Sequence, residues 1–234
     1  MVHPATTSRT RTPHFAPLAT EGVYPPQEDS QLLIDALEEA ELASGRRVLD
    51  LCTGSGVVAI AAAELGAASV TAFDICSRAV RCSRRNAHTA GVRVEVHHGP
   101  WTRALERGPF QVVVSNPPYV PTPAEAGPTP LAGGPEWSWN GGVDGRMVLD
   151  PLCESATRLL CSGGSLLLVQ SAFANVPRSL EMLRATGLVA EAVAEQWISF
   201  GPVLSARAGW LERTGQLETG CHQEQLVVIR ADKP

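Results

Sequence analysis

Short apolar segments rich in β-branched residues alternate along this chain with segments of helical length, and this alternation restricts the fold more than any other feature. Strand patterns lie at residues 48–51, 70–73, 92–97, 112–115, 165–170, 188–197 and 225–230. Helix patterns lie at residues 27–43, 56–65, 77–90, 145–161 and 176–186, and a short turn follows Trp101. Strands that are joined through helices run parallel. We therefore predict an α/β protein with a seven-stranded, mostly parallel sheet, an antiparallel last strand and helices on both faces.

Length and composition favour one globular domain, because the chain has 234 residues and 44% of them are hydrophobic. We predict a disordered tail over residues 1–20, which hold two Arg and no acid, and a single domain over residues 21–234. Such a tail composition also occurs in organellar transit peptides. Apolar stretches are far shorter than the roughly 20 residues that span a bilayer. We therefore expect a soluble, cytoplasmic protein that does not enter a membrane.

Charge and cysteine spacing argue against two classes of function. The net charge is −5, whereas proteins that bind duplex nucleic acid normally present a basic face. The basic cluster at residues 78–85 has helical spacing and is typical of a solvated helix face. None of the six cysteines has CxxC spacing. We therefore expect reduced, mostly buried thiols and no metal site.

One predicted strand ends in the sequence Asn116-Pro117-Pro118-Tyr119. Prolines cannot donate to a sheet ladder and they fix φ, so the backbone after residue 115 must leave the sheet as a rigid loop. The side-chain oxygen of Asn116 and the carbonyl of Pro117 could both accept hydrogen bonds from a planar NH₂ group, and Tyr119 could stack on its plane. A Pro-rich turn with a capping Asn is the simpler interpretation of the same residues.

The first predicted strand runs into a glycine turn that opens a helix. Gly54 and Gly56 allow a ligand to approach the backbone, and the helix start favours a carboxylate or phosphate group. Asp50, at the tip of this strand, could meet an ammonium group. Asp74 ends the next strand, where a carboxylate suits the two hydroxyls of a ribose. The residues therefore indicate a nucleoside-containing cofactor at the carboxyl ends of these strands.

The same glycines, followed by Ala59, also fit the dinucleotide pattern G-x-G-x-x-G/A, so NAD chemistry stays open at this point. Two features count against it. Asp50 would repel a pyrophosphate, and a nicotinamide enzyme does not need the acceptor pair at residues 116–117.

Together, the turn at residues 50–56, Asp74 and the loop at residues 116–119 resemble the Rossmann-like, class I methyltransferases that use S-adenosyl-L-methionine (AdoMet). Within them the chain is similar to the HemK/PrmC group, which methylates a glutamine side-chain amide in peptide-chain release factors. Segments at residues 26–30, 139–145 and 224–229 match that group as well. The likeness is greatest to its short, single-domain branch, because only about 45 residues precede the first strand. Amino-methylating DNA and RNA enzymes share the Asn-Pro-Pro-Tyr element.

The resemblance implies AdoMet as cofactor, with S-adenosyl-L-homocysteine as its product, and two sets of residues. The residues expected to bind AdoMet are Ser30, Asp50, Gly54, Gly56, Asp74, Ile75, Pro100, Trp101 and Asn116. The residues expected to act in catalysis are Asn116, Pro117 and Tyr119. The group usually has an Asp after the glycine at position 99, which accepts from the adenine amino group, and this chain has Pro100 there. The adenine contact must be made otherwise, or the affinity for AdoMet is lower.

The expected reaction is transfer of a methyl group to an amide or amino nitrogen, without a metal or a covalent intermediate. The favoured acceptor is a glutamine of a protein, such as the Gly-Gly-Gln loop of a release factor, and an activating partner subunit stays open. The alternatives are N6-adenine or another amino group of a nucleic acid, a small metabolite, and a module that binds AdoMet without catalysis. A nucleic-acid substrate would need a basic groove beside Asn116, which the acidic composition does not favour.

Overall fold

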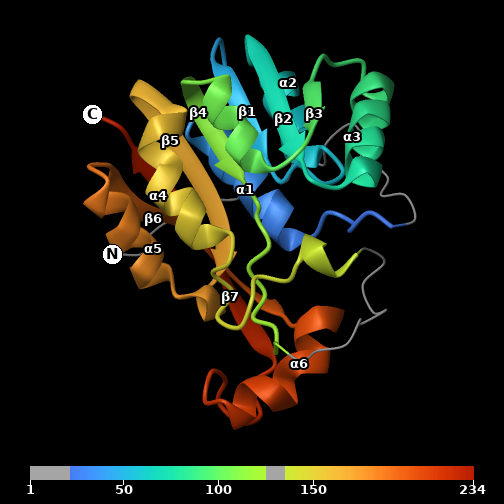
Figure 1. Ribbon diagram of the computed structural model, residues 1–234, viewed down its shortest axis with the longest axis vertical. Coiled ribbons are helices and arrows are strands. Elements are labelled where there is room, and N and C mark those ends of the chain that lie inside the picture. The colour runs from blue at the N-terminus through green and yellow to red at the C-terminus, as the bar shows by residue number, and fades with distance from the viewer. Residues whose placement is uncertain (1–21, 125–134) are drawn as a thin grey trace, which may run out of the picture.

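The computed structural model describes residues 22–124 and 135–234, and Figure 1 shows their arrangement. The tail predicted at residues 1–20 lies outside the described residues, as does the middle of the Pro/Gly-rich loop, at residues 125–134. Within the described ranges, no helix is both long enough and apolar enough to cross a membrane.

The strands of the described residues form a single seven-stranded sheet in the order β3-β2-β1-β4-β5-β7-β6. Their bounds are β1 Arg47–Leu51, β2 Ser69–Asp74, β3 Glu95–His98, β4 Phe110–Ser115, β5 Leu160–Ser171, β6 Val189–Ser199 and β7 Gln223–Asp232. β1 to β5 pair in parallel, and β7 runs antiparallel to both of its neighbours. This arrangement confirms the predicted mostly parallel sheet with an antiparallel last strand.

Helices cover both faces of the sheet, as predicted (Figure 1). Their bounds are α1 Glu28–Glu39, α2 Val57–Glu64, α3 Ser77–Thr89, α4 Leu149–Leu159, α5 Val176–Ala185 and α6 Pro202–Arg213. The alternation in β4 divides the core, because Val112 and Val114 pack with α1 and α2, whereas Val113 packs with α4. The faces are therefore buried by helices from different parts of the chain.

Some predictions of secondary structure were wrong. The helix predicted over residues 27–43 ends at Glu39, and the strand predicted over residues 92–97 begins only at Glu95. The helix predicted over residues 145–161 begins at Leu149 and ends at Leu159, because Gly145 has a positive φ of 75° and Leu160 already pairs with Phe110 of β4. Helix α6 was not predicted at all. Arg207 occupies the position where an apolar residue would have completed the buried stripe of α6, and this helix stands outside the alternation of strands and helices.

The topology gathers three strand ends at one edge of the sheet. β1 lies between β2 and β4, and all three run in the same direction, so their carboxyl ends are neighbours. The strand order reverses between β1 and β4, which is where open α/β sheets bind ligands. Figure 1 shows α6 beyond this edge, away from the body of the sheet.

Candidate active site

A cleft of about 380 Å³ opens at this edge of the sheet. The predicted site residues that line it are Ser30, Asp50, Gly54, Asp74, Ile75, Pro100, Trp101, Asn116, Pro117 and Tyr119. They come from the start of α1, the ends of β1, β2 and β4, and the turn after β3. Of the predicted residues, Gly56 does not line the cleft.

Asp74 joins the loops that follow β1 and β2. One of its carboxylate oxygens accepts from the Gly54 N–H at 2.8 Å, and the other accepts from the Cys76 N–H at 2.8 Å. Burial raises the pKa of Asp74, and these two backbone bonds lower it. Each carboxylate oxygen keeps a second lone pair, so Asp74 can still accept from two ligand hydroxyls.

Asp50 is a buried carboxylate, 1% exposed, at the bottom of the cleft. Thr53 donates a hydrogen bond of 2.5 Å to it. Burial raises the pKa of Asp50 to about 7, and the hydrogen bond from Thr53 opposes this effect. An ionised Asp50 therefore favours a ligand that brings a positive charge.

The charge of the lining tests which cofactor fits. Asp29, Asp50 and Asp74 line the cleft, and among the described residues its walls include no Lys, Arg or His. Three carboxylates suit a ligand with an ammonium and a sulfonium group, as AdoMet has, and would repel a pyrophosphate. The lining therefore counts against the NAD interpretation of the glycine turn.

Gly54 and Gly56 serve different purposes. Both have positive φ, 55° and 87°. A Cβ on Gly54 would meet no protein atom within 4 Å, and this glycine lines the cleft, so its missing side chain leaves room for a ligand. A Cβ on Gly56 would collide with Ser83 of α3, so Gly56 permits close packing of two helices.

The walls beside Asp74 are mainly apolar. Ile75, Pro100 and Trp101 line the cleft there, and Ile75 is 64% exposed. Such a surface suits a flat ring system by stacking and dispersion contacts. Pro100 offers an apolar surface at the position where the resemblance led us to expect an acidic side chain.

At the other end of the cleft, Asp29 of α1 fixes two of the predicted catalytic residues. The Asn116 amide donates to the Ser30 hydroxyl at 3.2 Å, and the Ser30 N–H donates to Asp29 at 2.6 Å. The Tyr119 hydroxyl donates to the other Asp29 oxygen at 2.8 Å. Burial and then the Asp29 charge raise the pKa of Tyr119, so its phenol stays protonated. This network orients the Asn116 amide and the Tyr119 ring.

Two oxygens at this end remain as acceptors. The bond to Ser30 uses the NH₂ of Asn116 and leaves its side-chain oxygen to accept. Within residues 22–124 and 135–234, no backbone N–H bonds to the Pro117 carbonyl. The geometry therefore offers an acceptor pair for a planar NH₂ group at the edge of the sheet.

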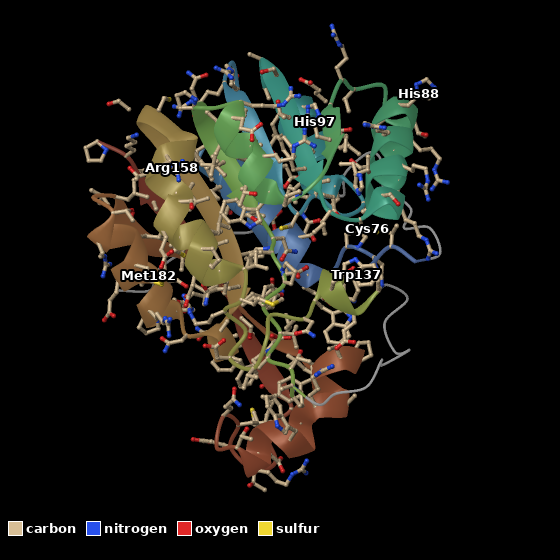
Figure 2. All side chains as sticks on the ribbon, viewed as in Figure 1. Cys76, His88, His97, Trp137, Arg158 and Met182 are labelled. Atoms are coloured by element: carbon tan, nitrogen blue, oxygen red, sulfur yellow. The ribbon has the colours of Figure 1, made fainter. Side chains whose placement is uncertain are left out.

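Some lining residues were not among those predicted. They are chiefly Asp29, Thr53, Trp137 and Met147. Asp29 belongs to the segment at residues 26–30 that matched the HemK/PrmC group, but an acid in the first turn of a helix is common for electrostatic reasons alone. Figure 2 shows Trp137 on the short turn Glu136–Ser138, between Cys76 and α6 in this view.

Comparison with known proteins agrees with this geometry. Residues 21–126 match the family described as "Methyltransferase small domain". The chain is 35% identical over 184 residues to the mouse protein "Methyltransferase HEMK2", covering 75% of this chain and 84% of the mouse protein. The chain belongs to the HemK family of methyltransferases.

A second HemK-family relative is the release factor glutamine methyltransferase of Deinococcus radiodurans. The two are 38% identical over 171 residues, which is 72% of this chain and 61% of the relative. The chain thus spans about three fifths of that relative's length.

Among solved structures, a chain of the E. cuniculi Mtq2–Trm112 complex, which methylates the translation termination factor eRF1, superimposes with a TM-score of 0.62. The two chains are 23% identical, and the match covers 91% of this chain and 99% of the other. This likeness shows the fold, which is that of the class I methyltransferases.

Proposed function

We propose that this protein is an AdoMet-dependent methyltransferase that acts on the side-chain amide of a glutamine in a protein, such as a peptide-chain release factor. The observation that carries the proposal is the acceptor pair of Asn116 and Pro117, at one end of a cleft whose other end holds Asp50 and Asp74. The names of the two curated relatives support methyl transfer, and one of them specifies a release factor glutamine.

AdoMet fits the cofactor end by charge and by shape. Asp50 would face its ammonium group, Asp74 would accept from the ribose hydroxyls, and Ile75, Pro100 and Trp101 would enclose the adenine. When bound, AdoMet supplies a methyl group on a positively charged sulfur as the electrophile. The carboxylates of Asp29, Asp50 and Asp74 in the lining would stabilise that positive charge.

The chain's residues prepare the nucleophile. An amide nitrogen is a poor nucleophile, because its lone pair is delocalised. The Asn116 oxygen and the Pro117 carbonyl would each accept one hydrogen of the substrate NH₂ and so aim its lone pair along the cleft. Positive charge develops on this nitrogen in the transition state, which strengthens both bonds. Tyr119, held by Asp29, would stack against the plane of the amide.

The rim of the cleft favours a protein as substrate. Trp137 and Met147 line the cleft and are 58% and 60% exposed. Exposed apolar side chains beside a cleft are typical of a protein-binding surface. A nucleic acid fits less well, because its phosphates would approach a lining with three carboxylates and, within the described residues, no cation.

Methyl transfer from tritium-labelled AdoMet tests the proposal. The full chain is incubated with a release factor, with the same factor after replacement of its Gly-Gly-Gln glutamine by alanine, with bulk RNA and with a metabolite extract. We expect label in the unmodified factor alone. Because the E. cuniculi structure is a complex with Trm112, each assay is repeated with a Trm112-type subunit. Label in RNA or in a metabolite, with none in the factor under either condition, would reject the proposal.

A further inference from the structure

A second, smaller cavity of about 40 Å³ adjoins the acceptor end of the cleft. The two cavities share the wall residues Tyr24, Asp29, Tyr119 and Val120. The other walls of the small cavity come from the beginnings of α1, α6 and β7 and from the end of β6. The two cavities therefore adjoin at Tyr119, beside the end of the cleft that holds Asn116.

Glu224, at the start of β7, is a wall residue whose bonding is incomplete. Its side chain is 6% exposed, and its Oε2 atom is buried with no hydrogen-bond partner among the described residues. A hydrogen bond with Ser171 satisfies part of the carboxyl group, and burial raises the pKa of Glu224 to about 7. A buried carboxylate oxygen without a donor is unfavourable, so a donor group from outside would stabilise it.

The beginning of α6 adds hydrogen-bond donors to the same cavity. Gly201, Val203 and Leu204 line the cavity, and within the described residues no side chain caps the first turn of α6. The first N–H groups of a helix have no partner within the helix and carry a partial positive charge. Pro202, the first residue of α6, has no N–H, so the donors are the N–H groups of Val203 and Leu204. The cavity therefore offers an acceptor at Glu224 and donors at the start of α6.

This combination distinguishes between possible ligand groups. A lysine or arginine head would suit the carboxylates of the lining but has no acceptor, so it would leave the N–H groups at the start of α6 without a partner. A carboxylate or phosphate would suit α6 but would be repelled by Glu28, Asp29 and Glu224, which all line the cavity. A peptide unit has one N–H donor and one carbonyl acceptor and matches both sides.

We propose that this cavity binds the peptide unit next to the methylated glutamine, with Glu224 accepting a hydrogen bond from its N–H and the start of α6 donating to its carbonyl. The proposal presupposes the protein-glutamine activity proposed above. A water molecule needs about 10–15 Å³ of such space. The cavity therefore has room for the polar atoms of a peptide unit but not for a large side chain.

The first test is Glu224→Gln, which keeps the size of the side chain. Ser171 can still donate to the amide oxygen, so the NH₂ of the new side chain would face the cavity and repel a peptide N–H. Because a hydrogen bond to a charged group is lost, we expect the KM for an intact release factor to rise about tenfold or more. We expect kcat and the affinity for S-adenosyl-L-homocysteine to change by less than about threefold. The matched control is Glu191→Gln on β6, an exposed acid that lines neither cavity.

The second test removes the donor from the substrate. An α-hydroxy acid replaces either the release-factor glutamine, with its side-chain amide kept, or the residue after it, one at a time, so that an ester oxygen takes the place of the backbone N–H in one of the two peptide units beside the glutamine. With the unmodified enzyme, one of the two esters should raise KM about tenfold. With Glu224→Gln the same ester should cost nothing further, since the contact is already absent.

The outcomes separate this inference from the proposed function. Binding of the intact factor to the enzyme with S-adenosyl-L-homocysteine is measured alongside turnover, so that a result is obtained even without methyl transfer. If the factor is methylated but Glu224→Gln and both esters leave KM and binding unchanged, the peptide subsite is wrong and the activity stands. If the factor binds in a Glu224-dependent way but receives no methyl group, the activity is wrong and the subsite stands. If the factor neither binds nor reacts, both are wrong.

Discussion

The two ends of the cleft are built in different ways. At the cofactor end, the contacts join neighbouring strand–loop units, as when Gly54 bonds to Asp74, 20 residues later. At the acceptor end, the contacts join distant segments: Asn116 bonds to Ser30 across 86 residues, and Tyr119 bonds to Asp29 across 90. The cofactor end is therefore fixed by the sheet itself, whereas the acceptor end depends on where the start of α1 lies. This difference predicts that variants at each end affect different steps.

At the cofactor end, the largest effect is expected at Asp74. Asp74→Ala removes the carboxylate that holds the Gly54 and Cys76 N–H groups and that would accept from the ribose. We expect the affinity for AdoMet to fall roughly 100-fold, because two hydrogen bonds to a charged group are lost. Isothermal titration calorimetry measures this, with Asp35→Ala on α1 as the control, since Asp35 lines neither cavity. Equal affinity in the two variants would show that Asp74 does not contribute to cofactor binding.

Tyr119→Phe tests the acceptor end. The ring remains, but its hydrogen bond to Asp29 is lost. We expect kcat to fall about tenfold while AdoMet affinity stays within about twofold, since orientation of the acceptor amide is what suffers. Asp29→Ala, which removes the acceptor of this hydrogen bond, should have a similar effect. The double variant should be little worse than either single one, because both remove the same contact; additive losses would show that the two residues act separately.

The cofactor end of the site could be predicted from the sequence better than the acceptor end. The turn from Asp50 to Gly54 could be predicted, because strand, glycine and helix are contiguous and each signals the next. The bond between Asp29 and Tyr119 could not, because it depends on how the first turn of α1 packs against the loop after β4. Glu224 directly precedes the strand predicted at residues 225–230, but its position against the acceptor end depends on α6, which carried no clear pattern.

Within the cofactor end, Gly54 and Gly56 should differ in their effects on stability and on AdoMet affinity. Gly54→Ala should destabilise the fold by only about 1 kcal/mol but lower AdoMet affinity about tenfold, because its Cβ projects into open space in a lining position. Gly56→Ala should cost about 2–3 kcal/mol of stability, because φ is 87° and Ser83 is in the way. Urea unfolding and calorimetry measure the two quantities. Similar stability losses for both variants would contradict the separate purposes assigned to these glycines.

The smallest expected effect concerns Asp50 and pH. Its pKa of about 7 in the folded protein is above the unfolded value of 3.8, so the folded state holds the proton more tightly. Stability of the ligand-free protein should therefore fall as pH rises from about 4 to about 7. At pH 8, Asp50→Asn should be more stable by roughly 1–2 kcal/mol, or about 3–6 °C in Tm. The same variant should bind AdoMet more weakly.

Glu224 titrates in the same window, with a pKa of about 7, so the two contributions must be separated. Differential scanning calorimetry from pH 4 to 8 compares the unmodified protein with Asp50→Asn and with Glu224→Gln. In each variant, Tm should depend less on pH than it does in the unmodified protein. A pH profile unchanged by Asp50→Asn would show that its buried charge is compensated in the free protein.

The proposed function depends on the Asn116 and Pro117 oxygens holding a planar NH₂ group in front of the methyl donor. Single-turnover methyl transfer to a release factor, at saturating AdoMet, tests it most directly with Asn116→Ala. We predict a rate loss of roughly 100-fold or more, far larger than any accompanying loss of affinity for S-adenosyl-L-homocysteine, while Gln196→Ala, an exposed amide on β6, has no effect. A normal rate for Asn116→Ala, or a loss explained entirely by weaker cofactor binding, would contradict the claim.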